Sequence, residues 1–230
     1  MNKYIVCLAN SRKHNGRCIA GIEVAQGERV GWIRPVSTRE HEEVLEWECR
    51  YRDGSNPRLL DVIDVPLIRH RPWLYQQENW TFNRHYYWER VNRLTWDDLP
   101  MLADPELPLW SNGSSTLNGI NDRIHLSSTQ DIGNSLRLIR VDRITLSVFA
   151  FGEAYGNPQR RVKGTFRYAG DEYRFTVTDP NYERKYLALE NGDYLIGESF
   201  VTVSLGEPHD DGYCYKLIAA IMERGGGPNQ

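Results

Sequence analysis

Short stretches in which hydrophobic and polar residues alternate recur along the chain, and they predict a protein built mainly from β-strands. Alternation sends neighbouring side chains to opposite faces of a strand, so Ala20, Ile22 and Val24 share one face of the second stretch. The first half of the chain contains four predicted strands, over residues 4–9, 18–24, 29–34 and 60–68.

The second half opens with the longest predicted strand, residues 136–149, in which the alternation changes phase near Asp142. Ile139 belongs to one register and Ile144 to the other, which predicts a β-bulge or a sharp bend. Residues 162–168 and 172–178 then form a predicted hairpin with its turn at Gly170 and Asp171, and Tyr173 points inward. Residues 200–205 and 213–222 complete the set of strands.

Three helix starts have recognisable capping residues. Ser37 and Glu40 have the spacing of a capping box, which predicts a helix running to about Glu48. Thr95 and Asp98 predict a second, short helix that stops near residue 105. Asp179 followed by proline predicts a third helix, ending by residues 191–192.

The stretch between residues 70 and 134 has a different character, with tryptophans scattered among polar residues. Residues 80–91 form a possible fifth strand, and residues 109–122 are rich in turn residues. We expect the aromatic side chains of this segment either to form a stacking platform or to fill the gap between two domains. These side chains are Trp80, Phe82, His85, Tyr86, Tyr87 and Trp88.

Both halves of the chain read as three strands, a helix and two strands. That is the order of the OB-fold, a five-stranded Greek-key barrel. We therefore predict a mainly β protein with two OB-fold-like five-stranded Greek-key barrels, short helices and an irregular, aromatic-rich connecting segment. Residues 1–134 hold the first barrel and the connecting segment, 135–224 the second barrel, and 225–230 a disordered tail. The alternative is a single irregular β-sandwich.

Composition narrows the possible functions. With a net charge of -3 and a pI near 6.1, the chain can attract phosphate only through a local patch. The four cysteines lack CxxC spacing, so neither a zinc site nor a redox dithiol is expected. The apolar stretch near the N-terminus is too short for a signal peptide or a membrane span, which predicts a cytoplasmic protein without membrane contact.

Several blocks of the sequence resemble the prokaryotic dual-OB-containing domain family. The most specific are LANSRK at 8–13, GRCIAG at 16–21 and VSLGEP at 203–208, joined by GWIRPVS at 31–37, LW at 109–110, NDR at 121–123 and KLIAA at 216–220. The resemblance spans nearly the whole chain. It implies a bacterial module that binds nucleic acid or nucleotides, sometimes grouped with defence or conflict systems, and it implies no established activity.

In an OB barrel the ligand lies across the second and third strands and under the loop that joins the first two. Cations beside an aromatic ring on that face suit a phosphodiester with a stacked base. The candidate nucleic-acid-binding residues are Arg12, Lys13 and Arg17 for phosphate, Trp32 for stacking, Arg34 for phosphate or a base edge, and Ser37. The alternative is a solvated loop with Trp32 in the core.

Secondary candidates lie elsewhere in the chain. Arg160, Arg161 and Lys163 extend a groove or guard an exposed strand edge with charge. Lys216 needs solvent or a carboxylate such as Asp179 or Glu207, in a pair that is more typical of structure than of catalysis. Trp88 belongs to the possible stacking platform.

No catalytic pattern stands out. The six histidines are dispersed, and no GxSxG, HxxxH or phosphate-loop motif occurs. We therefore expect a non-enzymatic module without cofactor or metal that binds single-stranded RNA or DNA, or a nucleotide. The alternative is a protein-interaction or regulatory subunit with a protein partner, and an enzyme acting on a nucleotide is a third possibility.

Overall fold

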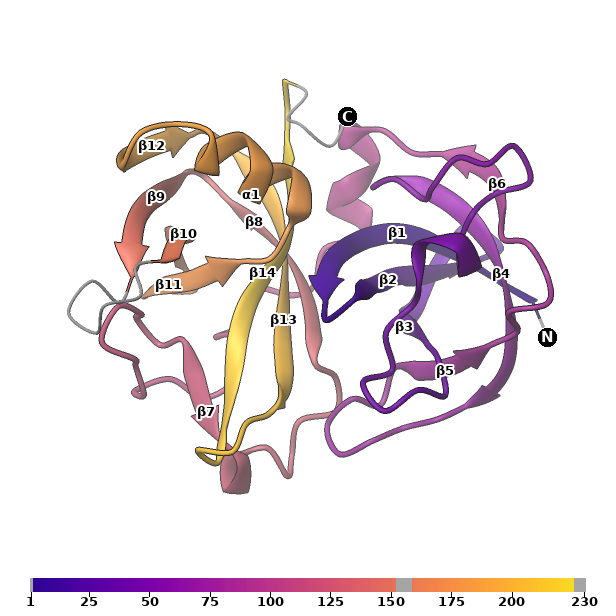
Figure 1. Cartoon of the computed structure of the whole chain (residues 1–230), viewed down its shortest axis with the longest axis horizontal. Coiled ribbons are helices and arrows are strands. Elements are labelled where there is room, and N and C mark those ends of the chain that lie inside the picture. The colour runs from indigo at the N-terminus through magenta and orange to yellow at the C-terminus, as the bar shows by residue number, and fades with distance from the viewer. Residues whose placement is uncertain (1, 152–158, 226–230) are drawn as a thin grey trace.

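The computed structural model describes residues 2–151 and 159–225. It contains two β-barrels side by side, with strands β1–β6 in one lobe and β8–β14 in the other (Figure 1). Residues 152–158, between the predicted strands at 136–149 and 162–168, and residues 226–230 of the predicted tail lie outside the described residues.

In the first barrel, every pair of neighbouring strands is joined by backbone hydrogen bonds, and the ring of strands is closed. Strands β1 (Asn2–Lys13), β2 (Gly16–Ala25) and β3 (Glu28–Val36) form an antiparallel meander. β3 pairs in parallel with β5 (Asn79–Phe82), which pairs with β4 (Asp61–His70), and β4 returns to β1. This order, with its parallel pair between the third and fifth strands, is that of an OB-fold.

The second barrel repeats this connectivity. β9 (Ile144–Phe151), β10 (Gln159–Tyr168) and β11 (Asp171–Val177) form the meander. β11 pairs in parallel with β14 (Tyr213–Glu223), followed by β13 (Ser199–Pro208) and β8 (Leu136–Val141). The prediction of two OB-like barrels is confirmed, and the single sandwich is not what the chain forms.

The predicted bend near Asp142 links β8, at one end of the second sheet, to β9 near its other end. β8 ends at Val141 and pairs with β13, whereas β9 begins at Ile144 and pairs with β10. Ile139 and Ile144 are nevertheless both buried in the second core. The change of phase therefore lets one stretch of chain serve two parts of the barrel wall while keeping its apolar side chains inside.

The predicted hairpin and the predicted cap of the third helix are also confirmed. The hairpin turn lies one residue earlier than predicted, at Ala169 and Gly170, which both have positive φ as a two-residue turn requires, and Asp171 already pairs with Tyr168. The Asp179 carboxylate accepts hydrogen bonds from the backbone N–H groups of Asn181 and Tyr182 at the start of α1 (Pro180–Leu187). α1 ends before residue 191, and β12 (Gly192–Ile196), which the sequence did not predict, follows and pairs with β9.

The predicted helix from Ser37 to Glu48 is wrong. Only a short 3-10 helix, η1 (Glu46–Glu48), forms there. Val44 exchanges two backbone hydrogen bonds with Arg17 at 2.8 and 2.9 Å, so the backbone at Val44 serves β2 instead of a helix. The Ser37 hydroxyl accepts a hydrogen bond from the backbone of Arg39 and closes a turn.

The connecting segment also differs from the prediction in detail. The possible strand over 80–91 is split into β5 and β6 (Glu89–Arg93) by turn and irregular residues between them. The helix predicted at Thr95 is confirmed as the 3-10 helix η2 (Trp96–Met101), where Asp98 accepts from the Thr95 backbone at 2.7 Å. β7 (Arg123–His125) pairs with β14, and the 3-10 helix η3 (Leu126–Ser128) follows it.

The two barrels bury part of each other's surface. The hydrophobic core around β1–β4 includes Leu136, Phe200 and Met222, which belong to second-barrel strands. The Thr202 hydroxyl donates to the carbonyl oxygen of Leu8 at 2.5 Å in a buried position. The long strands β13 and β14 accordingly run through the middle of the molecule, beside β1 (Figure 1).

Gly21 offers a test of the first barrel's packing. A Cβ at this position would lie 2.2 Å from the carbonyl oxygen of Val6 on β1, so Gly21→Ala must push two paired strands apart. We expect it to lower the free energy of unfolding by about 1–3 kcal/mol, the usual cost of overpacking. Urea denaturation measures this loss. Gly31→Ala on β3 is the matched control, because a Cβ there meets nothing within 4 Å, and an equal loss in both variants would contradict the explanation.

Candidate nucleic-acid interface

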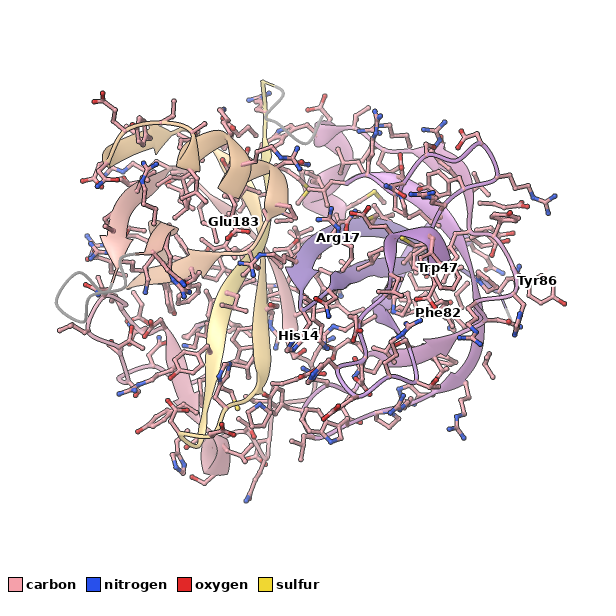
Figure 2. The ribbon with its side chains drawn as sticks, viewed as in Figure 1. His14, Arg17, Trp47, Phe82, Tyr86 and Glu183 are labelled. Atoms are coloured by element: carbon pink, nitrogen blue, oxygen red, sulfur yellow. The ribbon has the colours of Figure 1, made fainter. Side chains whose placement is uncertain are left out.

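The cations predicted to contact phosphate pair with carboxylates. The Arg12 guanidinium lies 3.0 Å from Glu183 on α1, and the Lys13 ammonium lies 2.6 Å from Glu207 on β13. The Arg12 backbone also donates to the carbonyl of Thr178 at 3.0 Å. Figure 2 shows Glu183 on the second-barrel side of this junction and Arg17 on the first-barrel side. The end of β1 thus joins the two barrels.

The other charged and aromatic side chains at the β1–β2 loop also contact neighbouring residues. The Arg17 guanidinium lies 2.6 Å from the Glu46 carboxylate. The His14 ring stacks on that of His41, with 3.8 Å between the ring centroids. All three cations predicted to contact phosphate are therefore neutralised by carboxylates.

Trp32 and Arg34 lie inside the protein. Trp32 is 6% exposed, and its indole Nε1 donates to the Asp104 carboxylate at 3.2 Å. Arg34 is 3% exposed, and its Nη2 lies 2.9 Å from Glu78 and 2.8 Å from the Ser135 hydroxyl. The alternative that Trp32 lies in the core is confirmed. Neither side chain has the exposed surface that a stacked base or a solvent-borne phosphodiester would need.

Ser37 and Trp88 are likewise buried. Ser37 is 6% exposed in its turn, and Trp88 is fully buried with its ring edge-on to Phe82. The expectation that the aromatic segment fills the gap between the barrels is wrong, because Trp88 belongs to the first core while Tyr86 and Tyr87 are 64% and 61% exposed. Tyr86 lies at the edge of the first lobe that is farthest from the second (Figure 2).

Lys216 is buried on β14 beneath the loop that carries Ser111. Its ammonium donates to the carbonyl of Ser111 at 2.8 Å and to the side-chain oxygen of Asn112 at 3.0 Å. Burial lowers the pKa of Lys216 to about 7, against the opposing effect of the Asp122 and Asp171 carboxylates. The expectation that Lys216 reaches solvent, Asp179 or Glu207 is wrong, because loop oxygens satisfy it first.

Arg160 and its neighbours have different roles. The Arg160 guanidinium donates to the carbonyls of Leu187 and Leu189, which stabilises the end of α1. Arg161 is one residue further along β10, so it points to the opposite, outer face of the barrel, with Lys163 two residues beyond it. The structure therefore separates Arg160 from Arg161 and Lys163, which the sequence had grouped together.

The outer face around β9, β10 and β11 carries five cations, which we call the outer basic face. Alternation along β10 places Arg161, Lys163 and Arg167 outward, because Val162 and Phe166 between them are buried in the core. Arg174 lies opposite Thr165 on the neighbouring strand β11. Arg143, with Arg167, lines a groove of about 320 Å³ at the end of this face. The outer basic face consists of Arg143, Arg161, Lys163, Arg167 and Arg174.

The cations of the outer basic face are close enough to change one another's pKa. Burial lowers the pKa of Lys163, Asp122 at 3.7 Å opposes this, and Arg174 and Arg161 lower the pKa further. Carboxylates are present but fewer: Asp122, Asp142 and Glu172 lie around the face, and Asp193 on β12 accepts a hydrogen bond from Ser147 at its border. Within the described part of the chain, neither Arg143 nor Arg167 has an ion-pair partner.

A family model for the dual OB-containing domain matches residues 3–221. The chain belongs to the dual OB-containing domain family. The resemblance inferred from the sequence blocks is thereby confirmed. No curated protein and no solved structure matches the chain.

The two barrels of this dual OB domain differ on the side that carries the ligand in other OB-folds. On the first barrel, the outer side of β2 and β3 is covered, with Arg29 and Trp32 both bonded to Asp104 and Arg34 bonded to Ser135. On the second barrel, the matching face on β10 and β11 keeps exposed side chains at Arg161 and Arg167. The family blocks LANSRK and VSLGEP meet at the junction through Lys13 and Glu207.

Sequence reasoning missed Arg143, Arg167 and Arg174. The alternation of β10 could have revealed the outward-facing cations, because every second residue from Arg161 to Arg167 is polar while Val162, Gly164 and Phe166 lie on the inner face.

The dual OB domain shows no group of three or more metal-ligating side chains among residues 2–151 and 159–225. None of the helices described there has the length and hydrophobicity needed to cross a membrane.

Proposed function

We propose that the outer basic face of the second barrel binds single-stranded nucleic acid and that the protein is a binding module, not an enzyme. The observation that carries the proposal is the contrast between the barrels. The face on which OB-folds bind their ligands is covered in the first barrel, whereas in the second barrel Arg143, Arg161 and Arg167 are exposed. Lys163 and Arg174 lie under the loop that carries Ile120 and Asp122 and add positive charge from below. A role in a prokaryotic defence system is part of this proposal on the family resemblance alone.

The chemistry of the face suits a phosphate backbone. Arginine and lysine provide the sequence-independent part of nucleic-acid affinity by releasing counterions from phosphates. Phe149 on β9 lies opposite Arg161, is partly exposed, and provides a ring on which a base can stack. Stacking contributes roughly 1–3 kcal/mol per base and tolerates any sequence, so we expect little sequence preference.

Charge reversal on the outer basic face tests the proposal. Arg161→Glu combined with Arg167→Glu should weaken binding of a fluorescein-labelled single-stranded oligonucleotide by about tenfold or more, because two phosphate contacts become repulsive. Fluorescence anisotropy at several salt concentrations measures the affinity. The slope of log affinity against log salt should become shallower in this variant.

The comparison variant is Arg12→Glu combined with Arg17→Glu, which the sequence alone predicts to abolish binding. These two cations are already paired with Glu183 and Glu46, so we now expect a much smaller effect. If this variant loses binding while the outer-face variant keeps it, the first barrel is the nucleic-acid site and the proposal fails.

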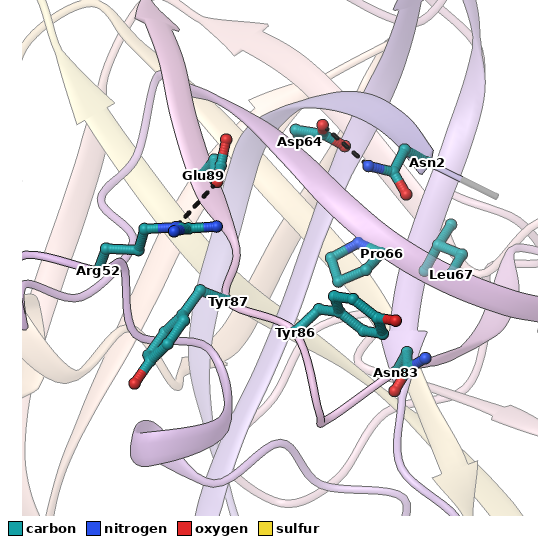
Figure 3. Close-up of a pocket in the computed structure, with 9 residues that line it drawn as sticks. All are labelled: Asn2, Arg52, Asp64, Pro66, Leu67, Asn83, Tyr86, Tyr87 and Glu89. Carbon is teal, nitrogen blue, oxygen red and sulfur yellow. Dashed lines mark hydrogen bonds and ion pairs between the residues drawn. The ribbon is translucent and has the colours of Figure 1, made fainter.

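A second candidate function, protein interaction, is favoured by the exposed tyrosines. Tyr86 and Tyr87 line a groove of about 420 Å³ on the first barrel, where Figure 3 shows Tyr86 beside Pro66 and Asn83 and Tyr87 on the side of Arg52. Exposed aromatic side chains are enriched at protein interfaces. A stoichiometric partner that co-purifies with the wild type but not with Tyr86→Ser, Tyr87→Ser supports this function, and an elevated 260/280 nm absorbance ratio supports the first.

A further inference from the structure

The junction between the barrels contains a pocket that is separate from the outer basic face. Its volume is about 230 Å³, below the roughly 300–1,000 Å³ typical of drug-sized sites, so it suits a small ligand. The first barrel contributes Ser11, Lys13 and Arg34, and the second contributes Ser204 and Glu207. A molecule bound here would touch both barrels at once.

Cations outnumber carboxylates in the lining of this junction pocket. Arg12, Lys13 and Arg34 line it, and Glu207 is the one carboxylate among the described lining residues. The partners that neutralise Arg12 and Arg34, which are Glu183 and Glu78, lie outside the lining. Within the described lining, three cations therefore face one carboxylate, which favours an anion.

The junction pocket also has unused hydrogen-bond donors. The Arg34 side chain is only 4% exposed, and its Nε is buried without a hydrogen-bond partner among the described residues. Leaving such a donor unsatisfied costs free energy, so an acceptor at this point is stabilising. The hydroxyls of Ser11 and Ser204 make no hydrogen bond to other residues of the described chain. Donors on several sides match the acceptor oxygens of an oxyanion.

We propose that the junction pocket binds a small phosphate monoester. The phosphate takes the place of the Glu207 carboxylate beside Lys13 and accepts a hydrogen bond from the Nε of Arg34. The rest of the molecule packs against Leu205 and Leu217, which form the apolar part of the lining. The proposal concerns a different site from the nucleic-acid interface and stands independently of it.

Two substitutions of opposite expected effect test the proposal. Lys13→Met removes a charge-assisted contact and should weaken binding of adenosine 5′-monophosphate by about tenfold or more. Glu207→Gln removes the competing carboxylate and should strengthen binding several-fold. Isothermal titration calorimetry measures both, with inorganic phosphate and ribose 5-phosphate as further probes. Tighter binding of the nucleotide than of ribose 5-phosphate identifies a contact with the base.

A matched ion pair elsewhere controls for structural effects. Lys3 and Glu23 lie 2.7 Å apart with side chains 19% and 16% exposed, so they resemble the Lys13–Glu207 pair but lie outside the pocket. Lys3→Met and Glu23→Gln should leave phosphate binding unchanged. The proposal is overturned if none of the three probes binds the folded wild type, or if Lys13→Met and Glu207→Gln change affinity in the same direction. It also fails if Arg161→Glu with Arg167→Glu abolishes binding of the mononucleotide while Lys13→Met does not.

Discussion

Replacing Arg34 with methionine is expected to lower the free energy of unfolding by about 3–5 kcal/mol, the usual cost of leaving a buried charge without its partner. The Glu78 side chain is fully buried and lies 2.9 Å from the Arg34 guanidinium. Without that guanidinium, Glu78 keeps only its hydrogen bonds from Ser135. Urea denaturation at neutral pH, followed by tryptophan fluorescence, measures the loss.

Two further variants separate burial from charge. Arg34→Met combined with Glu78→Met should recover much of the lost stability, because replacing both members of a buried pair with apolar residues is often neutral or stabilising. Arg52→Met breaks the exposed pair with Glu89, whose side chains are 75% and 51% exposed, and should cost no more than about 1 kcal/mol. A loss at Arg34 as small as that at Arg52 would refute the structural role we assign to Arg34.

The same contacts cover the side of the first barrel on which an isolated OB-fold carries its ligand. The connecting segment supplies Asp104 to Arg29 and Trp32, and the strand start at Ser135 supplies its hydroxyl to Arg34. The face that would lie against a nucleic acid instead contacts the rest of the chain. On the second barrel, by contrast, the corresponding strand β10 keeps Arg161 and Arg167 exposed.

Features decided by neighbouring residues were predictable from the sequence. The phase change near Asp142 gave the bend between β8 and β9, and Asp179 with Pro180 gave the start of α1. The sequence order of strands then predicted two OB-like barrels. Each of these signals acts over a few residues, through side-chain alternation or a cap, so the chain far away does not alter it.

Features decided by distant residues were not predictable. The capping box at Ser37 predicted a helix, but Val44 instead forms backbone hydrogen bonds with Arg17. Arg17 lies more than twenty residues before Val44 in the chain. Likewise, the alternation in β3 correctly puts Trp32 and Arg34 on one face, but it does not reveal what covers that face. Asp104 and Ser135 cover it from about 70 and 100 residues away, as a tertiary contact that overrides local pattern.

Contacts between distant residues also moved the candidate site from the β1–β2 loop to the outer basic face. The cations at 12, 13 and 17 were found as a basic loop, but their carboxylate partners Glu183, Glu207 and Glu46 belong to other elements. The run Arg160–Lys163 was found as basic as well, but only the strand register shows which of its members point outward. Charge in a sequence therefore marks where cations are, and the fold decides which of them meet solvent.

Lys216 gives the second large effect, a dependence of stability on pH. The folded-state pKa of Lys216 is lowered to about 7 by burial, whereas an unfolded chain gives a lysine its ordinary value of 10.5. Between these values the unfolded chain binds more protons than the folded one, so this residue makes stability rise with pH above 7. Below pH 7 the cost of burying the charge is present in full and does not vary.

Lys216→Met removes this titration and should be the more stable protein at pH 6, because methionine fills a similar volume without a charge to bury. The stability difference between this variant and the wild type should shrink by about 2 kcal/mol from pH 7 to pH 9, because folded Lys216 is half-titrated at pH 7 and each further pH unit is worth about 1.4 kcal/mol. Denaturation curves at several pH values measure that difference, in which other titrating groups cancel. Lys185→Met, at an exposed lysine on α1, should show no such trend. A pH-independent difference for Lys216→Met would mean that Lys216 stays charged when buried, held by Asp122 and Asp171 more strongly than burial disfavours it.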